Sequence, residues 1–293
     1  MEAIKNRLPD WIKVRRPSNT HLYRELTKLL EGDRLHTVCQ EANCPNIYSC
    51  FLRRSLTFMI LGSICTRNCS YCNVTSGKPH PPDEDEPVRV ARLIERLELE
   101  YVVITCVTRD DLDDGGAGIF SKTVKEIKRR APKCKVELLI SDLRGDWRAL
   151  ATIVDAKPEV IGHNVEITRE LFPKVRPQAS YSRSIELLKM VKAYNPKVVT
   201  KSGIMVGMGE TTEEIIRTME DVIGTGCNIM TIGQYLRPSS RHAPVRKFYE
   251  MEEFAVFKEI GESMGFDCVE SGPLVRSSYK AWESYQKVLG KRC

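Results

Sequence analysis

The feature that most restricts the fold is a regular alternation of patterns that begins at residue 57. Short runs rich in apolar and β-branched residues predict strands at residues 57–62, 102–107, 135–141, 160–165, 198–206 and 229–235. Stretches with helical character follow them at residues 86–100, 118–131, 144–156, 180–194, 211–225 and 252–265. The first of these stretches shows the 3.6-residue period of a helix in Val90, Leu93, Ile94 and Leu97.

Six strand-then-helix units predict a parallel sheet with right-handed crossovers. The nearly continuous apolar strands fit burial on both faces of such a sheet. Because no strand is followed by the glycine pattern of a Rossmann fold, we favour a curved, incomplete barrel over a doubly wound sheet. Six units are too few for a full eight-fold barrel. The predicted fold class is therefore α/β, a partial (β/α)6 barrel.

The sequence predicts three segments. Residues 57–240 form the barrel, residues 1–56 form an N-terminal extension, and residues 241–293 carry the last helix and a C-terminal extension. We expect the two extensions to pack over the barrel mouth. One helix is expected over residues 18–31, capped by Ser18 or Asn19 and ended by Gly32. The C-terminal extension ends in an amphipathic tail that contains Trp282 and Tyr285.

Composition points to a soluble cytoplasmic protein. Hydrophobic residues make up 42% and charged residues 29% of the chain, and no apolar run approaches the ~20 residues of a membrane span. The net charge of +6 is small, but Lys5, Arg7, Lys13, Arg15 and Arg16 make the N-terminal arm basic. This arm could meet an acidic protein partner. Nucleic acid is not expected as a partner, since no nucleic-acid-binding motif accompanies the charge.

The distribution of the cysteines indicates metal binding. Six of the eleven cysteines fall between Cys39 and Cys72, and a disulfide scaffold is not expected in a chain this long without an export signal. The other five have no partner at ligand spacing, and we interpret them as structural or incidental. They are Cys106, Cys134, Cys227, Cys268 and Cys293.

Directly after the first predicted strand, Cys65, Cys69 and Cys72 stand at the spacing C-x3-C-x2-C. Three thiolates do not complete a structural zinc site, which takes four ligands. They suit a cubane iron–sulfur cluster in which one iron stays open to bind and activate a small molecule. The alternative is a zinc knuckle that takes its fourth ligand from elsewhere in the chain.

A second group, Cys39, Cys44 and Cys50, has the spacing C-x4-C-x5-C and is again one ligand short of four. Pro45 and the nearby asparagines favour a turning loop over a helix in this stretch. The alternative is that these are buried cysteines without a ligand.

Functional side chains of such barrels lie where the strands end. The loop at residues 108–116 is dense in carboxylates. Asn164 and Glu166 follow the fourth strand and should point to the same side. An amide and a carboxylate placed together can bond adjacent ribose hydroxyls. The alternative is a polar pair that faces solvent.

Two later loops are also polar. A glycine-bearing turn at residues 203–211 lacks the lysine of a P-loop, so we interpret it as backbone passing close to an adenine or a substrate. Thr211 or Thr212 should cap the helix that follows this turn. Arg237 and Arg241 follow the sixth strand and could hold a carboxylate or an acidic partner, or could form structural ion pairs.

The C-x3-C-x2-C motif resembles the signature of the radical S-adenosylmethionine (SAM) enzymes. Together with C-x4-C-x5-C and the Arg-Ser-Ser-Tyr tail at residues 276–279, it resembles the lipoyl synthases from about Leu8 to Tyr279. Residues 102–116, 163–181 and 231–242 are also typical of that family, and none of the cysteine motifs departs from its pattern.

The resemblance implies two [4Fe-4S] clusters. The residues of the first cluster, which binds and reductively cleaves SAM, are Cys65, Cys69 and Cys72, with Tyr71 beside the adenine. The residues of the second, auxiliary cluster are Cys39, Cys44 and Cys50, with Ser277 as the fourth ligand and Ser278 as the less favoured reading.

The reaction that the resemblance implies is sulfur insertion at carbons 6 and 8 of an octanoyl group, with the auxiliary cluster as sacrificial sulfur donor. The octanoyl group is amide-linked to a lysine of a lipoyl carrier domain, as in 2-oxoacid dehydrogenase E2 or the glycine cleavage H protein. A ferredoxin- or flavodoxin-type reductant and an iron–sulfur carrier for cluster repair are the other implied partners. Rival interpretations are a biotin-synthase-like or methylthiotransferase-like enzyme and a non-catalytic zinc or iron–sulfur protein. The tail serine and the C-x4-C-x5-C motif argue against the two rival enzymes.

Overall fold

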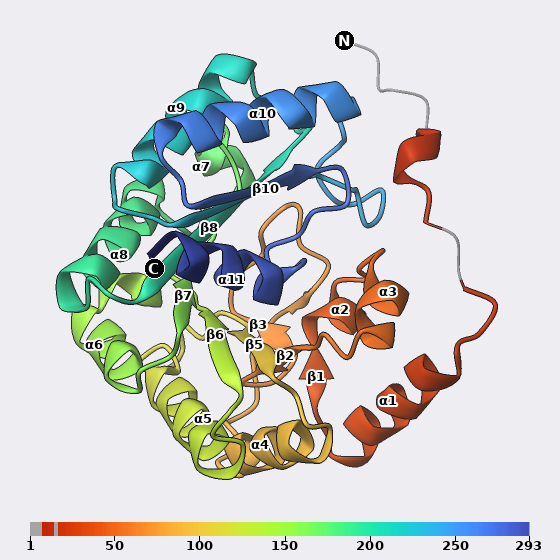
Figure 1. The fold of residues 1–293 in the computed structure, drawn as a ribbon, viewed down its shortest axis with the longest axis vertical. Helices are drawn as coiled ribbons and strands as arrows, with labels where there is room; N and C mark the ends of the chain where they lie inside the picture. Colours follow the sequence, from red (N-terminus) through yellow and green to blue (C-terminus); the bar gives the residue numbers. More distant parts are fainter. Residues whose placement is uncertain (1–7, 15–16, 293) are drawn as a thin grey trace. The chain divides into compact units, whose positions relative to one another are not determined.

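The computed structural model describes residues 8–14 and 17–292 (Figure 1). These residues form two compact units. The N-terminal unit comprises residues 14, 17–68 and 73–161, and the C-terminal unit comprises residues 8–13, 69–72 and 162–292. The three-segment division expected from the sequence stays a prediction.

The alternation expected from residue 57 is confirmed in the N-terminal unit. Its parallel strands are β2 (Thr57–Ile60), β5 (Tyr101–Cys106) and β6 (Lys135–Leu139), and β5 pairs with both of the others. Helices α4 (Glu86–Arg96), α5 (Ala117–Arg130) and α6 (Trp147–Asp155) pack side by side (Figure 1). Val90, Leu93 and Ile94 of α4 are buried, as their spacing predicted. Each such side chain contributes about 1.5–3 kcal/mol by leaving water.

Short elements surround the cysteines of this unit. Strand β1 (His36–Thr37) pairs antiparallel with β2, and β3 (Ile64–Cys65) pairs in parallel with β4 (Thr75–Ser76). The expected N-terminal helix is α1 (His21–Gly32). The expected cap, Ser18 or Asn19, is wrong: Thr20 holds the N-cap position without a side-chain capping bond, and Asn19 accepts the His21 N–H at 3.0 Å from one residue further out.

The prediction of a turning loop over the Cys39–Cys50 stretch is wrong at both ends. Cys39 lies in the short helix α2 (Val38–Glu41), and Cys50 lies in α3 (Ile47–Leu52). The Thr37 side chain caps α2 by accepting the N–H of Gln40. The breaking residues act only between the two helices, where Asn43 has a φ of +50°. Cys44 therefore lies in a turn, as predicted.

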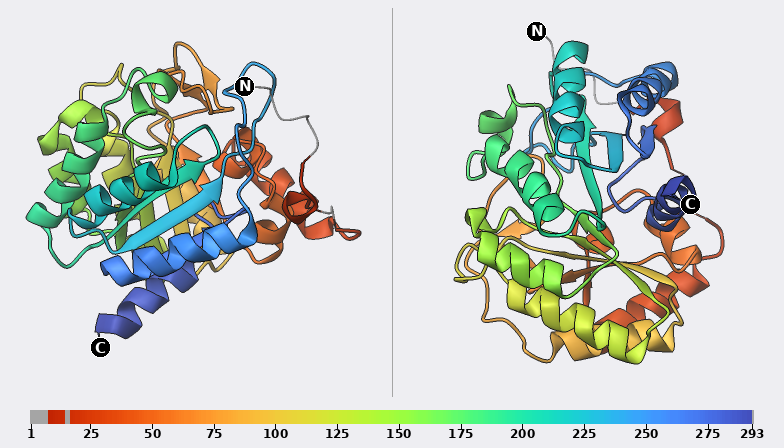
Figure 2. Two further views of the ribbon diagram at one scale, coloured as in Figure 1. Left: turned by 90° about the horizontal axis from the view of Figure 1, so that it is seen from above. Right: turned by 60° about the vertical axis from the view of Figure 1, so that its left-hand side comes forward.

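The C-terminal unit repeats the same alternation. Strand β7 (Val160–Gly162) lies at the division between the units, and β8 (Val199–Val206) pairs in parallel with β9 (Ile229–Gln234). Helices α8 (Tyr181–Tyr194), α9 (Thr212–Ile223) and α10 (Met251–Met264) accompany these strands, and α10 runs beside β9 (Figure 2). Thr211 caps α9 as expected and forms a reciprocal pair with Glu214. The remaining elements are η1 (Asp10–Ile12), α7 (Phe172–Val175) and α11 (Ala281–Arg292).

A further parallel strand, β10 (Cys268–Gly272), pairs with β9 and was not predicted. Because it ends in Glu, Ser and Gly, its sequence lacks the apolar run that predicts a strand. Ile204 and Val206 of β8 and Met230 and Ile232 of β9 face a buried cluster that includes apolar residues of α9 and α10. The opposite side of these strands therefore carries Gly203, Thr231 and Gly233.

Two further expectations concern membrane spans and the basic N-terminal arm. No helix within residues 8–14 and 17–292 is long and apolar enough to cross a membrane. Of the basic arm, Lys5, Arg7, Arg15 and Arg16 lie outside the described residues, while Lys13 forms an ion pair with Asp10. Cys293 also lies outside them.

Candidate functional site

The first cysteine of the C-x3-C-x2-C motif is fixed by a sharp turn after β2. Leu61 and Gly62 both adopt positive φ angles, of 68° and 87°. The Leu61 N–H donates to the buried carboxylate of Glu86 at 2.7 Å, and burial raises the pKa of Glu86. The chain then enters β3, where Cys65 is held against Ser76 of β4. Its Sγ accepts the backbone N–H of Arg67 at 3.4 Å.

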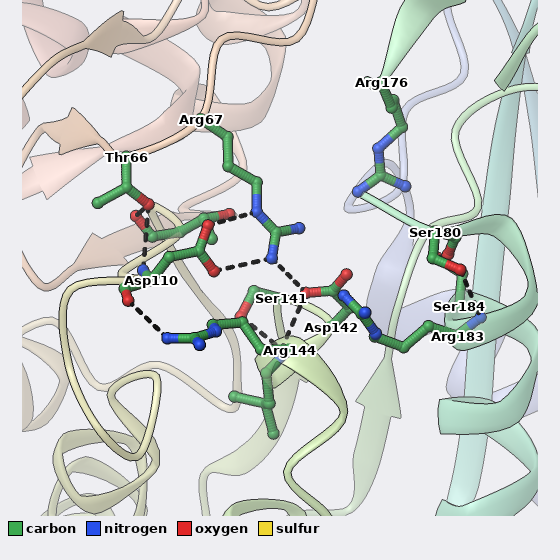
Figure 3. A network of polar contacts seen from close by, with 12 residues as sticks. Thr66, Arg67, Asp110, Ser141, Asp142, Arg144, Arg176, Ser180, Arg183 and Ser184 are labelled. Carbon is green, nitrogen blue, oxygen red and sulfur yellow. Dashed lines mark hydrogen bonds and ion pairs between the residues drawn. The ribbon is translucent and has the colours of Figure 1, made fainter. Parts of the chain in front are cut away.

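The loop after Cys65 is tied to the strand-end loops of β5 and β6 (Figure 3). Arg67 is only 5% exposed. Its guanidinium donates to both carboxylate oxygens of Asp110, at 2.7 and 2.8 Å, and to Asp142 at 2.6 Å. Thr66 adds a backbone and a side-chain hydrogen bond to the carbonyl of Thr108, both at 3.0 Å.

Several carboxylates of the 108–116 loop have structural roles. Arg109 is 1% exposed and pairs with both oxygens of Asp111 at 2.8 Å, which lowers the pKa of Asp111. Arg109 also donates to the carbonyl of Leu61 at 3.1 Å. Asp114 accepts the N–H groups of Gly116 and Gly118 at the start of α5. This loop therefore supports the turn that precedes Cys65.

The other half of the motif belongs to the C-terminal unit. Ser70 donates its N–H to the carbonyl of Val175 at 3.0 Å and accepts the N–H of Ala243 at 2.8 Å. His242 lies 3.0 Å from the carbonyl oxygen of Cys72 through Nε2. These contacts hold the short segment from Cys69 to Cys72 against the chain that follows β9.

Asn164 and Glu166 do point to the same side, as predicted. Glu166 has a φ of +75°, and its carboxylate accepts the amide N–H of Asn164 at 3.1 Å. The Oδ1 atom of Asn164 is buried and has no hydrogen-bond partner within the described residues. A buried acceptor without a partner fits a ligand that donates a hydroxyl group.

Tyr71 lies close to this pair and packs on the cluster of β8, β9, α9 and α10. Burial raises the pKa of Tyr71 well above its ordinary value, and the charge of Glu166 raises it further. Burial also raises the pKa of Glu166, while the charge of Arg176 acts in the opposite direction. Gly203 lets Thr231 and Asn164 pack closely against the backbone of β8, because a Cβ at this position would come within 2.2 Å of Thr231 Oγ1 and 3.3 Å of Asn164 Oδ1.

The second cysteine group gathers within the N-terminal unit. Cys39 is buried, whereas Cys44 and Cys50 are partly exposed. The Cys44 N–H donates to the Cys39 carbonyl at 2.9 Å, and the Cys50 N–H donates to that of Asn46 at 2.9 Å. Burial, and then the charges of Cys44 and Cys50, raise the pKa of the Cys39 thiol to about 12. Three thiols that repel one another when ionised fit a cationic iron centre, which offsets that repulsion.

Each cysteine group supplies three thiols, a donor set that suits a cubane iron–sulfur cluster. Within residues 8–14 and 17–292, no three or more His, Cys, Asp and Glu side chains are arranged to hold a metal ion.

The Arg-Ser-Ser-Tyr tail forms a turn over β9 within the C-terminal unit. The Tyr279 N–H donates to the Arg276 carbonyl at 2.9 Å, which places Ser277 and Ser278 at the two central positions of the turn. The tail approaches β9 closely, because a Cβ on Gly233 would lie 2.1 Å from the Val275 carbonyl oxygen.

Two expected ligand loops contact the chain itself. A Cβ on Gly207 would lie 2.1 Å from Gln234 Nε2, so the close backbone approach expected in this turn is to β9. Arg237 donates to the carbonyls of His242 and Ser240, which supports a structural role for it. Burial raises the pKa values of the isolated thiols of Cys106, Cys134, Cys227 and Cys268, in agreement with structural cysteines.

Sequence reasoning did not single out Arg67 or His242. The available signal for Arg67 was an arginine inside the cysteine motif of a chain with a carboxylate-rich strand-end loop. For His242 no local signal exists, since its contact to Cys72 spans 170 residues.

The sequence pattern of the Radical SAM superfamily matches residues 59–222. The chain is 53% identical over 275 residues to the lipoyl synthase of Caldanaerobacter subterraneus subsp. tengcongensis, covering 94% of this chain and 96% of that protein. It is 50% identical over 275 residues to the lipoyl synthase of Rubrobacter xylanophilus, covering 94% and 85%.

Among solved structures, the chain resembles methylornithine synthase with a TM-score of 0.55 and 14% identity, covering 75% of this chain and 72% of that one. It resembles Streptococcus suis SuiB bound to S-adenosylmethionine with a TM-score of 0.54 and 12% identity, covering 89% and 66%. These likenesses concern the fold alone. The predicted α/β class, with mostly parallel strands and intervening helices, is confirmed as the fold of the radical SAM enzymes.

Proposed function

The chain belongs to the lipoyl synthase family of the radical SAM superfamily, and on that premise we propose that it inserts sulfur at carbons 6 and 8 of an octanoyl group. The octanoyl group is amide-linked to a lysine of a lipoyl carrier domain. Breaking unactivated C–H bonds is beyond any side-chain base, so a cofactor must carry that chemistry. Membership of the superfamily implies a [4Fe-4S] cluster and SAM.

Cys65, Cys69 and Cys72 are the proposed ligands of this cluster. When bound, the cluster supplies the electron with which SAM is cleaved to the radical that removes hydrogen atoms from the substrate. The chain holds Cys65 through the turn at Leu61 and Gly62 and holds Cys72 through His242. An open fourth position on the iron leaves room for SAM.

Tyr71, Asn164 and Glu166 are the proposed contacts of SAM. The unpartnered Oδ1 of Asn164 would accept a ribose hydroxyl, and the Glu166 carboxylate, which Asn164 already orients at 3.1 Å, would accept the neighbouring one. Tyr71 packs on an apolar cluster beside this pair and would contact the adenine. The absence of a side chain at Gly203 lets Asn164 lie close to β8.

Cys39, Cys44 and Cys50 are the proposed ligands of an auxiliary [4Fe-4S] cluster, with Ser277 or, less favoured, Ser278 as the fourth ligand. Burial, and then the charges of Cys44 and Cys50, raise the pKa of Cys39 to about 12. Bound iron would favour the thiolate and so offset both effects. This cluster would be the sacrificial source of sulfur. A serine oxygen is a harder ligand than a thiolate and binds a soft cluster less well, so it would leave easily as the cluster is consumed.

The proposed partners follow from this reaction. They are an octanoylated lipoyl domain, a ferredoxin- or flavodoxin-type reductant, and an iron–sulfur carrier that restores the auxiliary cluster. The cytoplasmic location expected from the sequence stays a prediction.

The observation that carries this proposal is the presence of two triple-cysteine motifs in a chain that is 50% identical to a lipoyl synthase over 94% of its length. An anaerobic single-turnover assay tests it, with reconstituted protein, SAM, a strong reductant and an octanoylated lipoyl domain. Intact mass should show a carrier that has gained two sulfur atoms and lost two hydrogen atoms. If deoxyadenosine forms and the carrier mass is unchanged, radical SAM chemistry stands and lipoyl synthesis does not.

A further inference from the structure

A network of ion pairs joins three loops of the N-terminal unit (Figure 3). At its centre is Arg67, which is 5% exposed and lies two residues after Cys65. One guanidinium serves two carboxylates there: it makes a two-pronged contact with Asp110 and a single contact of 2.6 Å with Asp142. Asp142 is fully buried. Removing one member of such a network leaves an uncompensated buried charge.

The carboxylates of the network are themselves held in place. Asp142 also accepts the backbone N–H of Arg144 at 3.2 Å. The backbone of Asp110 is bonded on both sides: its N–H donates to Thr66 Oγ1 at 3.1 Å, and its carbonyl accepts the Arg144 guanidinium at 3.0 Å. The network therefore joins the cysteine loop to the loops after β5 and β6 as one rigid piece.

The network contacts Cys65 through the backbone of Arg67. The N–H of Arg67 donates to Cys65 Sγ at 3.4 Å, so the residue whose side chain is anchored by the two carboxylates is itself bonded to the thiol. Hydrogen bonds to the sulfurs and the nearby charges are among the factors that set the reduction potential of an iron–sulfur cluster. Both factors come together at this residue.

We propose that Arg67 is a positioning residue: through Asp110 and Asp142 it holds the Cys65 loop in its cluster-binding shape and sets the reduction potential of the cluster. This inference rests on the proposed function, in which Cys65 is an iron ligand. It assigns to Arg67 a task that neither the cysteines nor the SAM contacts perform.

The charges predict opposite shifts for the two sides of the network. Losing the cation in Arg67→Gln leaves two carboxylates near Cys65, which disfavours an added electron and lowers the reduction potential. The substitution Asp142→Asn removes one negative charge and leaves the Arg67 cation with one carboxylate, which raises the reduction potential of the cluster. Arg67→Lys keeps the charge and loses the fork that binds both oxygens of Asp110, so its potential should lie near that of the parent while cluster retention falls.

The experiment is an anaerobic redox titration of the full-length reconstituted protein, followed by EPR. The signal to follow is the one that changes when SAM is added, which separates this cluster from the auxiliary one. At a fixed solution potential, Arg67→Gln should show a reduced-to-oxidised ratio about tenfold lower than the parent, or about 59 mV for one electron. Asp142→Asn should shift the ratio in the opposite direction. Iron and sulfide per chain are measured on the same samples.

Arg130→Gln is the matched control. Arg130 ends α5 and pairs with two carboxylates, Glu95 at 3.5 Å and Glu126 at 3.4 Å, which lie on α4 and α5 and not in the loops around Cys65. Its loss should lower thermal stability and leave the potential of the SAM-responsive signal unchanged.

Each outcome decides the inference. Loss of the SAM-responsive cluster in Arg67→Gln with retention in Arg130→Gln supports the inference, as do shifts of opposite sign in Arg67→Gln and Asp142→Asn. Equal potentials and equal iron in the parent and in all variants overturn it, and so does equal loss of the cluster in Arg67→Gln and Arg130→Gln. If the parent protein itself has no SAM-responsive cluster, the proposed function fails first and takes the inference with it.

Discussion

Replacing Gly233 by alanine should separate the position of the Arg-Ser-Ser-Tyr tail from the stability of the fold. The added Cβ would lie 2.1 Å from the carbonyl oxygen of Val275 and 3.3 Å from the Arg276 guanidinium. Cβ atoms in proteins essentially never come closer than 3.0 Å to another atom, so the two groups must separate by about 0.9 Å.

The tail should be the part that moves. Gly233 lies in β9, which is paired on one side with β8 and on the other with β10. The tail is irregular here, and its bonds include the Val275 N–H to the Gly272 carbonyl at 3.1 Å and the Arg276 guanidinium to the Val275 carbonyl at 2.7 Å. Overpacking of this kind costs about 1–3 kcal/mol of unfolding free energy.

The consequence for activity should exceed the consequence for stability. Ser277 and Ser278 lie two and three residues after Val275, so the proposed serine ligand moves with the displaced carbonyl. We expect sulfur insertion to fall about tenfold or more, while deoxyadenosine formation stays within about twofold of the parent. The measurements are single-turnover product mass, deoxyadenosine yield and a thermal melt on the same preparation.

Gly272→Ala is the matched control, because Gly272 pairs with Gly233 in the sheet. A Cβ there would meet only a methyl carbon of Val275, at the ordinary contact distance of 3.4 Å. The reasoning is refuted if Gly233→Ala inserts sulfur as well as Gly272→Ala does at equal stability.

Three further predictions concern the proposed ligands. Ser277→Cys should retain a full complement of iron and lose most sulfur insertion, because a thiolate leaves the cluster less easily than a serine oxygen. If Ser278→Cys shows this behaviour instead, the fourth ligand is Ser278. If neither variant differs from the parent, the proposal of a serine ligand is wrong. Asn164→Ala should weaken SAM binding about tenfold, a loss of about 1.4 kcal/mol, without changing iron content, and unchanged SAM affinity by equilibrium binding would contradict the ribose contact. In the iron-free protein, burial and the charges of Cys44 and Cys50 raise the pKa of Cys39 from 9.0 to about 12. The contribution of Cys39 to the free energy of unfolding is therefore complete below pH 9 and is lost as pH rises towards 12. Anaerobic urea denaturation should show that Cys39→Ala loses less stability at alkaline pH than the parent, and an equal loss of stability would refute this.

The regular part of the fold could be predicted from sequence because burial and periodicity coincide there. The apolar run at residues 229–235 became β9 (Ile229–Gln234), and Thr211 capped α9 as its position indicated. Strand β10 escaped prediction because two apolar residues precede Glu, Ser and Gly, so its pairing with β9 supplies what local propensity does not. The helices around Cys39 and Cys50 escaped for a similar reason: each is a few residues long and depends on a cap or on neighbouring chain.

The candidate site was predictable where spacing carries chemistry and not where charges pair across the chain. The cysteine spacings indicated the candidate cluster ligands, and the spacing of Asn164 and Glu166 predicted the side-chain pair that the structure contains. In contrast, the sequence contains many carboxylates near residue 110, and nothing local indicates that Asp110 and Asp142 hold Arg67 whereas Asp114 caps a helix. Which carboxylates pair with Arg67 depends on which strand ends become neighbours in the folded chain.

The account rests on the auxiliary cluster as the source of sulfur, and an isotope label tests this most directly. The protein is reconstituted with sulfur-34 sulfide, freed of unbound sulfide, and allowed one turnover with an octanoylated lipoyl domain of natural isotope content. The account predicts that both inserted sulfur atoms carry the label, and that a Cys39→Ala, Cys44→Ala, Cys50→Ala protein forms deoxyadenosine without inserting sulfur. Unlabelled sulfur in the product, or sulfur insertion by the triple variant, would contradict it.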